Sequence, residues 1–194
     1  MILYLHGFRS SPHSFKARLL ADRMRALGRA DDYLCPQLPP SPAAAIALAE
    51  SLIAAQPAQK LTLIGSSLGG YYATWLAEQT GCHAVLLNPA VSPPQDLAKY
   101  VGTTTAWHSG EPFEFKPEYI DELHALAVPR ISRPERYFLV AATGDEVLDW
   151  RDMTAHYAGA RQLVIQGSDH GLSDFAGQMD AVLAFCDAAA ETPA

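Results

Sequence analysis

An apolar run that stops at a Gly-x-Ser-x-Gly motif constrains this chain most. Leu61–Ile64 reads as a strand, Gly65-Ser66-Ser67-Leu68-Gly69 follows it, and Leu68–Gln79 reads as a helix. A serine hydroxyl is a poor nucleophile until a tight turn holds it out of regular structure beside a base. The flanking glycines permit such a strand-to-helix turn, because a Cβ at either position would clash. The pattern therefore predicts a nucleophile at Ser67.

Short apolar segments alternate with helical segments along the chain. We expect strands at Ile2–Leu5, Tyr33–Cys35, Leu61–Ile64, His83–Leu87, Tyr137–Ala142 and Arg161–Ile165, and helices at Ser14–Leu27, Pro42–Gln56, Leu68–Gln79, Asp149–Tyr157 and Asp174–Ala190. Strands that are apolar on both faces are typical of a parallel sheet covered on both sides by helices. The sequence thus predicts an α/β fold whose polar site residues follow the carboxyl ends of strands.

Length and composition narrow the class of protein. The 194 residues fit one domain spanning 1–194, and 49% hydrophobic with 18% charged residues is an ordinary globular composition. The net charge of −7 argues against a nucleic-acid partner, because phosphate contacts need concentrated Lys and Arg. No apolar stretch approaches the roughly 20 residues of a membrane helix, and the first residues lack a basic signal-peptide region. We expect a cytoplasmic protein with no membrane partner.

A serine nucleophile needs a general base, and the base needs an orienting carboxylate. The expected strand Tyr137–Ala142 runs into a loop that holds three acids. Asp145 lies immediately beyond the strand, whereas Asp149 stands where it would cap the next helix. Asp145 is therefore favoured as the triad acid and Asp149 as a structural cap, with Glu146 as a minor alternative.

The base is expected at His170. Of seven histidines, only His170 follows a late strand in a glycine-flanked loop, Gly167-Ser-Asp-His-Gly171. The chain order Ser67, Asp145, His170 is the order that hydrolases with a strand–turn–helix serine use. Asp169 is adjacent to the histidine, so its side chain is expected to point elsewhere.

A tetrahedral intermediate also needs preorganised N–H donors. One is expected to be the backbone amide of Leu68, at the start of the helix after the nucleophile. The other should come from the loop after the first strand, where we assign it to Phe8, with Arg9 as the alternative. His6 is interpreted as a residue that braces this loop, since the position of the base is already filled.

No pattern in the sequence indicates a metal or a cofactor. The three cysteines, Cys35, Cys82 and Cys186, are an odd and scattered set that matches neither a disulfide framework nor a zinc ribbon. No H-x-x-x-H or C-x-x-C spacing and no Gly-rich phosphate loop occurs. We therefore expect a protein that works without a metal ion or cofactor.

These motifs together resemble the α/β-hydrolase superfamily, and in particular its compact bacterial esterases of the YqiA type. The matching segments are Tyr4–Pro12, Gly65–Tyr72, Leu87–Val91, Thr143–Asp149 and the loop of His170. The resemblance implies a minimal fold of about six strands, without the early antiparallel strands of larger members. It also implies a triad of Ser67, His170 and Asp145 that hydrolyses carboxylic esters or thioesters.

Residues 92–133 interrupt the alternation, at the usual place for a short helical cap insertion. Five aromatic residues could line an acyl pocket or could equally anchor the cap: Tyr100, Trp107, Phe113, Phe115 and Tyr119. Because the segment is short, we expect an open site that prefers short acyl chains. The first thirty residues are basic and 111–122 is acidic, so Arg9 could contact an anionic part of a substrate or brace its loop through a carboxylate such as Glu114.

The leading interpretation is a serine esterase that acts on a small-molecule ester or thioester through an acyl-enzyme. An acyl thioesterase or an amidase would use the same parts. From another class, a hydrolase-fold interaction protein with an idle triad would show no reaction with serine-directed reagents, and Trp107 or Tyr119 could then dock a partner.

Overall fold

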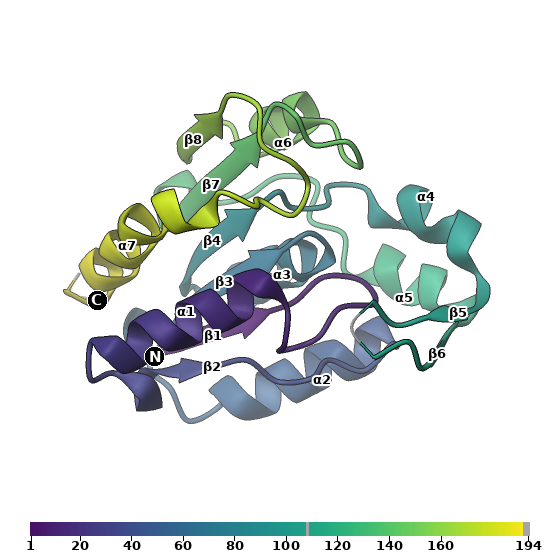
Figure 1. Ribbon diagram of the computed structural model, residues 1–194, viewed down its shortest axis with the longest axis horizontal. Coiled ribbons are helices and arrows are strands. Elements are labelled where there is room, and N and C mark those ends of the chain that lie inside the picture. Colours follow the sequence, from purple (N-terminus) through teal and green to yellow (C-terminus); the bar gives the residue numbers. More distant parts are fainter. Residues whose placement is uncertain (108, 192–194) are drawn as a thin grey trace.

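A six-stranded sheet forms the centre of the computed structural model, which describes residues 1–107 and 109–191 (Figure 1). All neighbouring strands pair in parallel, in the order β2-β1-β3-β4-β7-β8. The strands are β1 (Ile2–Leu5), β2 (Tyr33–Leu34), β3 (Thr62–Ser66), β4 (His83–Leu87), β7 (Tyr137–Ala142) and β8 (Arg161–Ile165). The expected α/β fold with a parallel sheet is confirmed.

The central strands are buried on both faces, which is why they read as unbroken apolar runs. Because successive side chains of a strand point to opposite faces, each strand contributes to two separate cores. Leu3 and Leu63 enter one core, and Ile2 and Ile64 enter the other.

Helices cover both faces of this sheet. On one face α1 (Phe15–Ala26) and α7 (Met179–Glu191) lie side by side, nearest the viewer in Figure 1. The opposite face is covered by α2 (Pro42–Ile53), α3 (Leu68–Thr80), α5 (Glu118–Ala125) and α6 (Trp150–His156). Within the described residues, no helix combines the length and apolarity needed to cross a membrane.

Most element boundaries fall within two residues of those expected, and the final helix differs most. Its expected first turn is a separate 3-10 segment, Phe175–Gly177, and α7 begins only at Met179. Gly177 explains the break, because glycine has low helix propensity. The strand before the serine motif ends at Ser66, two residues later than expected.

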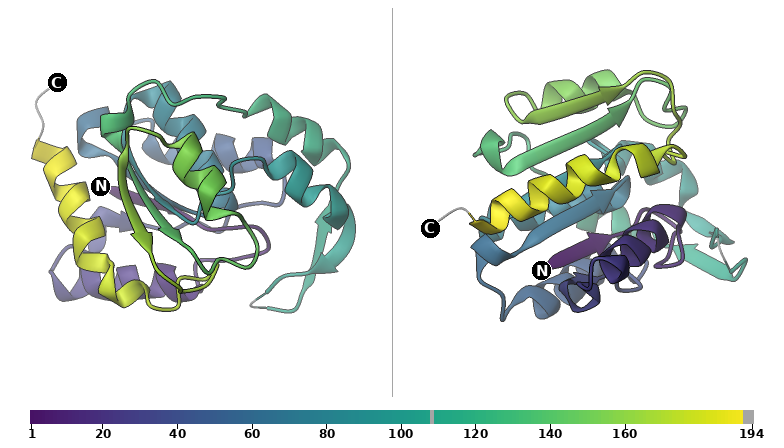
Figure 2. Two further views of the ribbon diagram at one scale, coloured as in Figure 1. Left: turned by 90° about the horizontal axis from the view of Figure 1, so that it is seen from above. Right: turned by 60° about the vertical axis from the view of Figure 1, so that its left-hand side comes forward.

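The insertion at 92–133 contains more than helices. Helix α4 (Pro93–Leu97) and a 3-10 turn lead into an antiparallel hairpin of β5 (Gly102–Thr105) and β6 (Pro112–Phe115), which α5 follows. In both views of Figure 2 this hairpin projects from the body of the molecule. The sequence did not predict it, because β5 reads Gly-Thr-Thr-Thr without apolar residues and β6 has only four residues.

Most arginines of the basic first thirty residues pair away from the hairpin. Arg23 of α1 bonds Asp180 of α7 at 2.9 Å, and Arg29 bonds Asp187 at 2.8 Å. In the acidic segment, Glu122 accepts hydrogen bonds from the Ser41 hydroxyl and the Ala43 amide at the start of α2. Arg23, Arg29 and Glu122 therefore join elements of the fold to one another.

Candidate active site

A sharp turn between β3 and α3 presents Ser67. Its backbone has φ 54° and ψ −121°, a conformation that L-residues rarely adopt. The turn needs glycine on both sides, because a Cβ on Gly65 would lie 2.3 Å from the Gly69 carbonyl oxygen, and one on Gly69 would lie 2.0 Å from the Leu5 carbonyl oxygen. The steric reason given for the flanking glycines is confirmed.

The structure brings Ser67, His170 and Asp145 together in one line. The Ser67 Oγ lies 3.0 Å from His170 Nε2, and His170 Nδ1 lies 2.8 Å from Asp145 Oδ2. The Asp145 side chain has no exposed surface, whereas the imidazole is 20% exposed. With its proton on Nδ1, His170 donates to the carboxylate and leaves Nε2 free to accept the serine proton.

The four acids near the histidine make different contacts. Asp145 also accepts the amide hydrogens of Val147 and Leu148 through Oδ1, both at 2.8 Å. Asp149 caps α6 by accepting from the Arg151 amide. The remaining two acids, Glu146 and Asp169, accept from the backbone amides of His170 and Ser173. Of these four acids, only Asp145 forms a hydrogen bond with the ring of His170.

The two backbone amides expected to stabilise an oxyanion have no acceptor among the described residues. Neither the Phe8 amide nor the Leu68 amide donates a hydrogen bond to any other described residue, and Leu68 is the first residue of α3. The loop that carries Phe8 is braced by His6, as expected. Its Nε2 accepts from the Leu38 amide at 3.0 Å, and its Nδ1 lies 3.0 Å from the Gly7 carbonyl oxygen.

Backbone strain gathers in the loops around this line of side chains. Within residues 1–107 and 109–191, the non-glycine residues with positive φ are Arg9, Ser67, Asn88, Ser168 and Leu172. Each lies in a loop that follows the carboxyl end of a central or edge strand of the sheet. Such conformations persist where the surroundings over-determine them, and they cluster at functional sites.

An open cleft of about 280 Å³ lies above Ser67 and His170. Its walls come from the loop of Phe8, from α4 and the turn after it, and from the loop after β7, and they include Leu97, Lys99, Tyr100, Trp107 and Val147. Trp107 is 67% exposed. Partial burial raises the pKa of the Asp96 carboxyl, which also lines this cleft, while Lys99 opposes the rise.

The sequence left open whether the five aromatic residues of the insertion line the cleft or anchor the insertion. In the structure, some anchor the insertion and others line the cleft. Phe115 is fully buried and packs edge-on against Phe8 at 5.1 Å between ring centroids, and Phe113 does so at 5.3 Å. Tyr119 packs against Phe115. Only Tyr100 and Trp107 reach the cleft.

Comparison with known protein families identifies the group to which the chain belongs. Residues 1–187 match the model of the family described as "Uncharacterised protein family (UPF0227)". The chain belongs to this family. The α/β-hydrolase fold expected from the motifs is confirmed by solved structures that share it.

Solved structures with the same fold differ widely from this UPF0227 chain in sequence. A protein of Agrobacterium vitis S4 has a TM-score of 0.75 at 18% identity, covering 95% of this chain and 87% of its own. Alpha/beta hydrolase domain-containing protein 10 from mouse has a TM-score of 0.70 at 16% identity, covering 94% and 89%. Est1E from Butyrivibrio proteoclasticus has a TM-score of 0.70 at 14% identity, covering 98% and 88%. At these identities the likeness shows the fold.

Arg9 ties the loop of Phe8 to the hairpin. Its Nε donates to the Thr105 carbonyl oxygen at 2.5 Å, its guanidinium lies 4.1 Å from the Trp107 ring centroid, and its own carbonyl accepts from the Trp107 amide at 2.9 Å. Arg9 therefore braces the loop through a carbonyl and an indole. The expected carboxylate partner, such as Glu114, is not found, since no carboxylate of the described residues forms an ion pair with Arg9.

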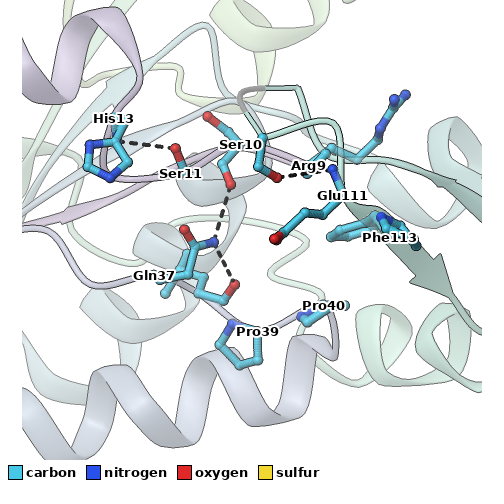
Figure 3. Close-up of a pocket in the computed structure, with 13 residues that line it drawn as sticks. Arg9, Ser10, Ser11, His13, Gln37, Pro39, Pro40, Glu111 and Phe113 are labelled. Atoms are coloured by element: carbon cyan, nitrogen blue, oxygen red, sulfur yellow. Dashed lines mark hydrogen bonds between the residues drawn. The ribbon is translucent and has the colours of Figure 1, made fainter.

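A second, larger pocket of about 700 Å³ lies on the other side of Arg9, without contact to Ser67 or His170 (Figure 3). Its lining includes Gln37 and Glu111, and the Arg9 guanidinium points away from both. Arg9 thus separates this pocket from the cleft above Ser67.

Sequence reasoning missed the role of Asn88, which it treated only as the end of a strand. The Asn88 side chain is fully buried, accepts from the Ala142 amide at 2.8 Å, and donates to the carbonyls of Asp169 and His170 at 3.0 and 3.2 Å. It thereby joins the end of β7 to the loop of His170. No local signal in the sequence marks this role, because the partners of Asn88 lie 54 to 82 residues away in the chain.

Proposed function

We propose that this UPF0227 protein is a serine hydrolase that cleaves carboxylic esters with short acyl chains through an acyl-enzyme. The observation that carries the proposal is the continuous contact from Ser67 Oγ through His170 to the buried Asp145 carboxylate. Contacts of this kind activate a serine hydroxyl that would otherwise be a weak nucleophile.

In the acylation step, His170 Nε2 takes the proton of Ser67 as Oγ bonds to the acyl carbonyl carbon. The carbonyl electron pair moves to oxygen, where the Phe8 and Leu68 amides stabilise the oxyanion; each such donor contributes on the order of 3 kcal/mol. Asp145 stabilises the imidazolium. The bond to the leaving oxygen then breaks, and Nε2–H gives its proton to the departing alcohol.

In the deacylation step, a water molecule attacks the acyl group held on Ser67. His170 takes a proton from this water, the same two amides stabilise the second oxyanion, and the Ser67 oxygen leaves with the proton from Nε2. The acid is released and the enzyme returns to its starting protonation state without a cofactor or metal ion.

The size and lining of the cleft support short acyl chains. At about 280 Å³ it lies at the lower end of small-molecule sites, and its lining includes the apolar side chains of Leu97 and Val147. Tyr100 and Trp107 would contact the acyl chain, and Arg9 would contact an anionic group carried at its far end. These substrate contacts are part of the proposal.

Reaction with a fluorophosphonate tests the nucleophile directly, because the reagent forms a covalent adduct with an activated serine. We expect one adduct on the peptide that contains Ser67, none in Ser67→Ala, and an unchanged adduct in Ser51→Ala, which alters an exposed serine of α2. An unlabelled wild type would instead favour the interaction protein with an idle triad.

A matched substrate series then defines the leaving group. An oxygen ester, a thioester and an amide of the same short acid share the acyl-enzyme, so differences in kcat/KM isolate the leaving-group step. We expect the oxygen ester to react best. A preference for the thioester or the amide would replace esterase by thioesterase or amidase without changing the triad.

A further inference from the structure

Lys16 is a buried lysine that the proposed mechanism does not use. It lies in the first turn of α1, with 8% of its surface exposed, and its Nζ donates to the Gly171 carbonyl oxygen at 2.5 Å. Gly171 directly follows His170 in the chain. Lys16 therefore holds the backbone next to the histidine from the helix that follows the loop of Phe8.

The loop of His170 needs such contacts because its backbone is strained. Ser168 and Leu172 have positive φ on either side of the histidine, at 59° and 50°. Three consecutive carbonyls of the loop are held by buried side chains: those of Asp169 and His170 by Asn88, and that of Gly171 by Lys16. Lys16 supplies the contact that follows the histidine.

Burial of an ammonium group is costly, and an apolar side chain could pack at this position without that cost. Burial lowers the pKa of Lys16 to about 8, while the carboxylates of Asp169 and Asp145 act in the opposite direction. The amine is thus close enough to the Asp145–His170 pair to interact with its charge. The cost of burying Lys16 is explained if its hydrogen bond to the Gly171 carbonyl oxygen holds His170 in position.

We propose that Lys16 is a positioning residue, which fixes the imidazole of His170 between Ser67 and Asp145 by holding the Gly171 carbonyl. This inference rests on the proposed function for its effect on catalysis, and on the geometry alone for its effect on His170. Lys16 does not line the cleft above Ser67, so it should affect the chemical step and leave substrate binding unchanged.

The test compares Lys16→Met, which keeps the length of the side chain and removes the donor, with Tyr137→Phe. Tyr137 is the first residue of β7 and donates a hydrogen bond to Glu78 Oε1. The control therefore also loses a side-chain hydrogen bond, but at the end of β7 that lies away from Asp145. With a short-chain ester, we expect Lys16→Met to lower kcat by about 10- to 100-fold, because small misplacements of catalytic groups cost this much. KM should stay within about twofold, and Tyr137→Phe should retain the wild-type kcat.

A second readout does not depend on turnover. The proton shared by His170 Nδ1 and Asp145 should give a low-field proton NMR signal, which His170→Gln would assign by its loss. We expect Lys16→Met to shift or broaden this signal and Tyr137→Phe to leave it unchanged. An unaltered signal in folded Lys16→Met would overturn the inference, as would equal losses of kcat in the two variants. A wild type that fails to label at Ser67 would refute the proposed function, while the NMR comparison would still decide the role of Lys16.

Discussion

The turn that carries Ser67 and the hairpin at 102–115 show opposite kinds of packing. At the turn the backbone leaves no room, since a Cβ on Gly69 would lie 2.0 Å from a carbonyl oxygen of β1 and a Cβ on Gly70 would lie 2.6 Å from Pro89. In the hairpin, a Cβ on Gly102 or Gly110 would meet no atom within 4 Å. The turn is therefore tightly packed, whereas the hairpin has open space beside these two glycines.

This difference separates two demands on an enzyme. The groups that react must be held to within a fraction of an ångström, whereas a wall that selects substrates can differ among proteins of one fold. The tightly packed turn meets the first demand, and the projecting hairpin can meet the second. The following experiments test this division.

The largest effect is expected from Gly69→Ala. The new methyl group would overlap the Leu5 carbonyl oxygen, and relief would require a shift of β1 or of the start of α3, so we expect a loss of more than about 3 kcal/mol of stability or no folded protein. Gly177→Ala is the control, because its Cβ would meet no atom within 4 Å. Thermal unfolding of the two variants measures the difference, and similar melting temperatures would contradict the close packing of the turn.

Asp145→Asn should lower kcat by about 10³- to 10⁴-fold while the protein remains folded, because the amide cannot stabilise the imidazolium and favours the wrong tautomer of His170. Asp149→Asn is the matched variant, since it changes a helix cap four residues away and should lose little activity. Ester hydrolysis by both variants distinguishes them. If Asp149→Asn were the more damaging, the acids would have been assigned wrongly.

Lys16 should make the free energy of unfolding depend on pH. Its pKa is about 8 in the folded protein and 10.5 when unperturbed, so the unfolded chain binds more protons between these values and stability rises with pH across this window. The gain is at most a few kcal/mol, because each pKa unit corresponds to about 1.4 kcal/mol. Urea unfolding at pH 7.5 and 10 should show a smaller rise for Lys16→Met than for the wild type or for Lys99→Met, whose lysine is exposed.

On the hairpin side, Arg9→Ala should raise KM for acidic esters about two- to fivefold more than for neutral esters of the same length, as expected for one partly exposed ionic contact. Loss of the Thr105 and Trp107 contacts alone would affect both esters equally. Steady-state kinetics with the two esters decides between recognition of an anion and a purely structural brace.

The smallest effect on stability is expected from Trp107→Ala, within about 0.5 kcal/mol, because the indole is largely exposed. The acyl-length profile of kcat/KM should nevertheless broaden, since one wall of the cleft is removed. Tyr119→Ala provides the contrast, because that ring packs on Phe115 and should affect stability more than selectivity. An unchanged acyl-length profile in Trp107→Ala would show that this side chain does not select the substrate.

The sequence predicted the sheet and the positions of Ser67, Asp145 and His170, because each follows an apolar strand and a short motif marks each turn. It did not predict the hairpin, whose β5 reads Gly-Thr-Thr-Thr and is held by contacts between distant segments. Asn88 and Lys16 were missed for the same reason. Their partners lie 81 and 155 residues away in the chain, and no local pattern reports such contacts.

The bonds between Arg9 and the hairpin have a consequence for how this protein can be altered by evolution or engineering. Arg9 is adjacent to Phe8 and contacts Thr105 and Trp107, so the segment best suited to diversify is attached to the loop that carries an oxyanion donor. Libraries that randomise 102–115 should therefore yield many variants with new preferences and reduced turnover. Retaining Thr105 and Trp107 while varying residues 109–111, which precede β6, would allow the two properties to change independently.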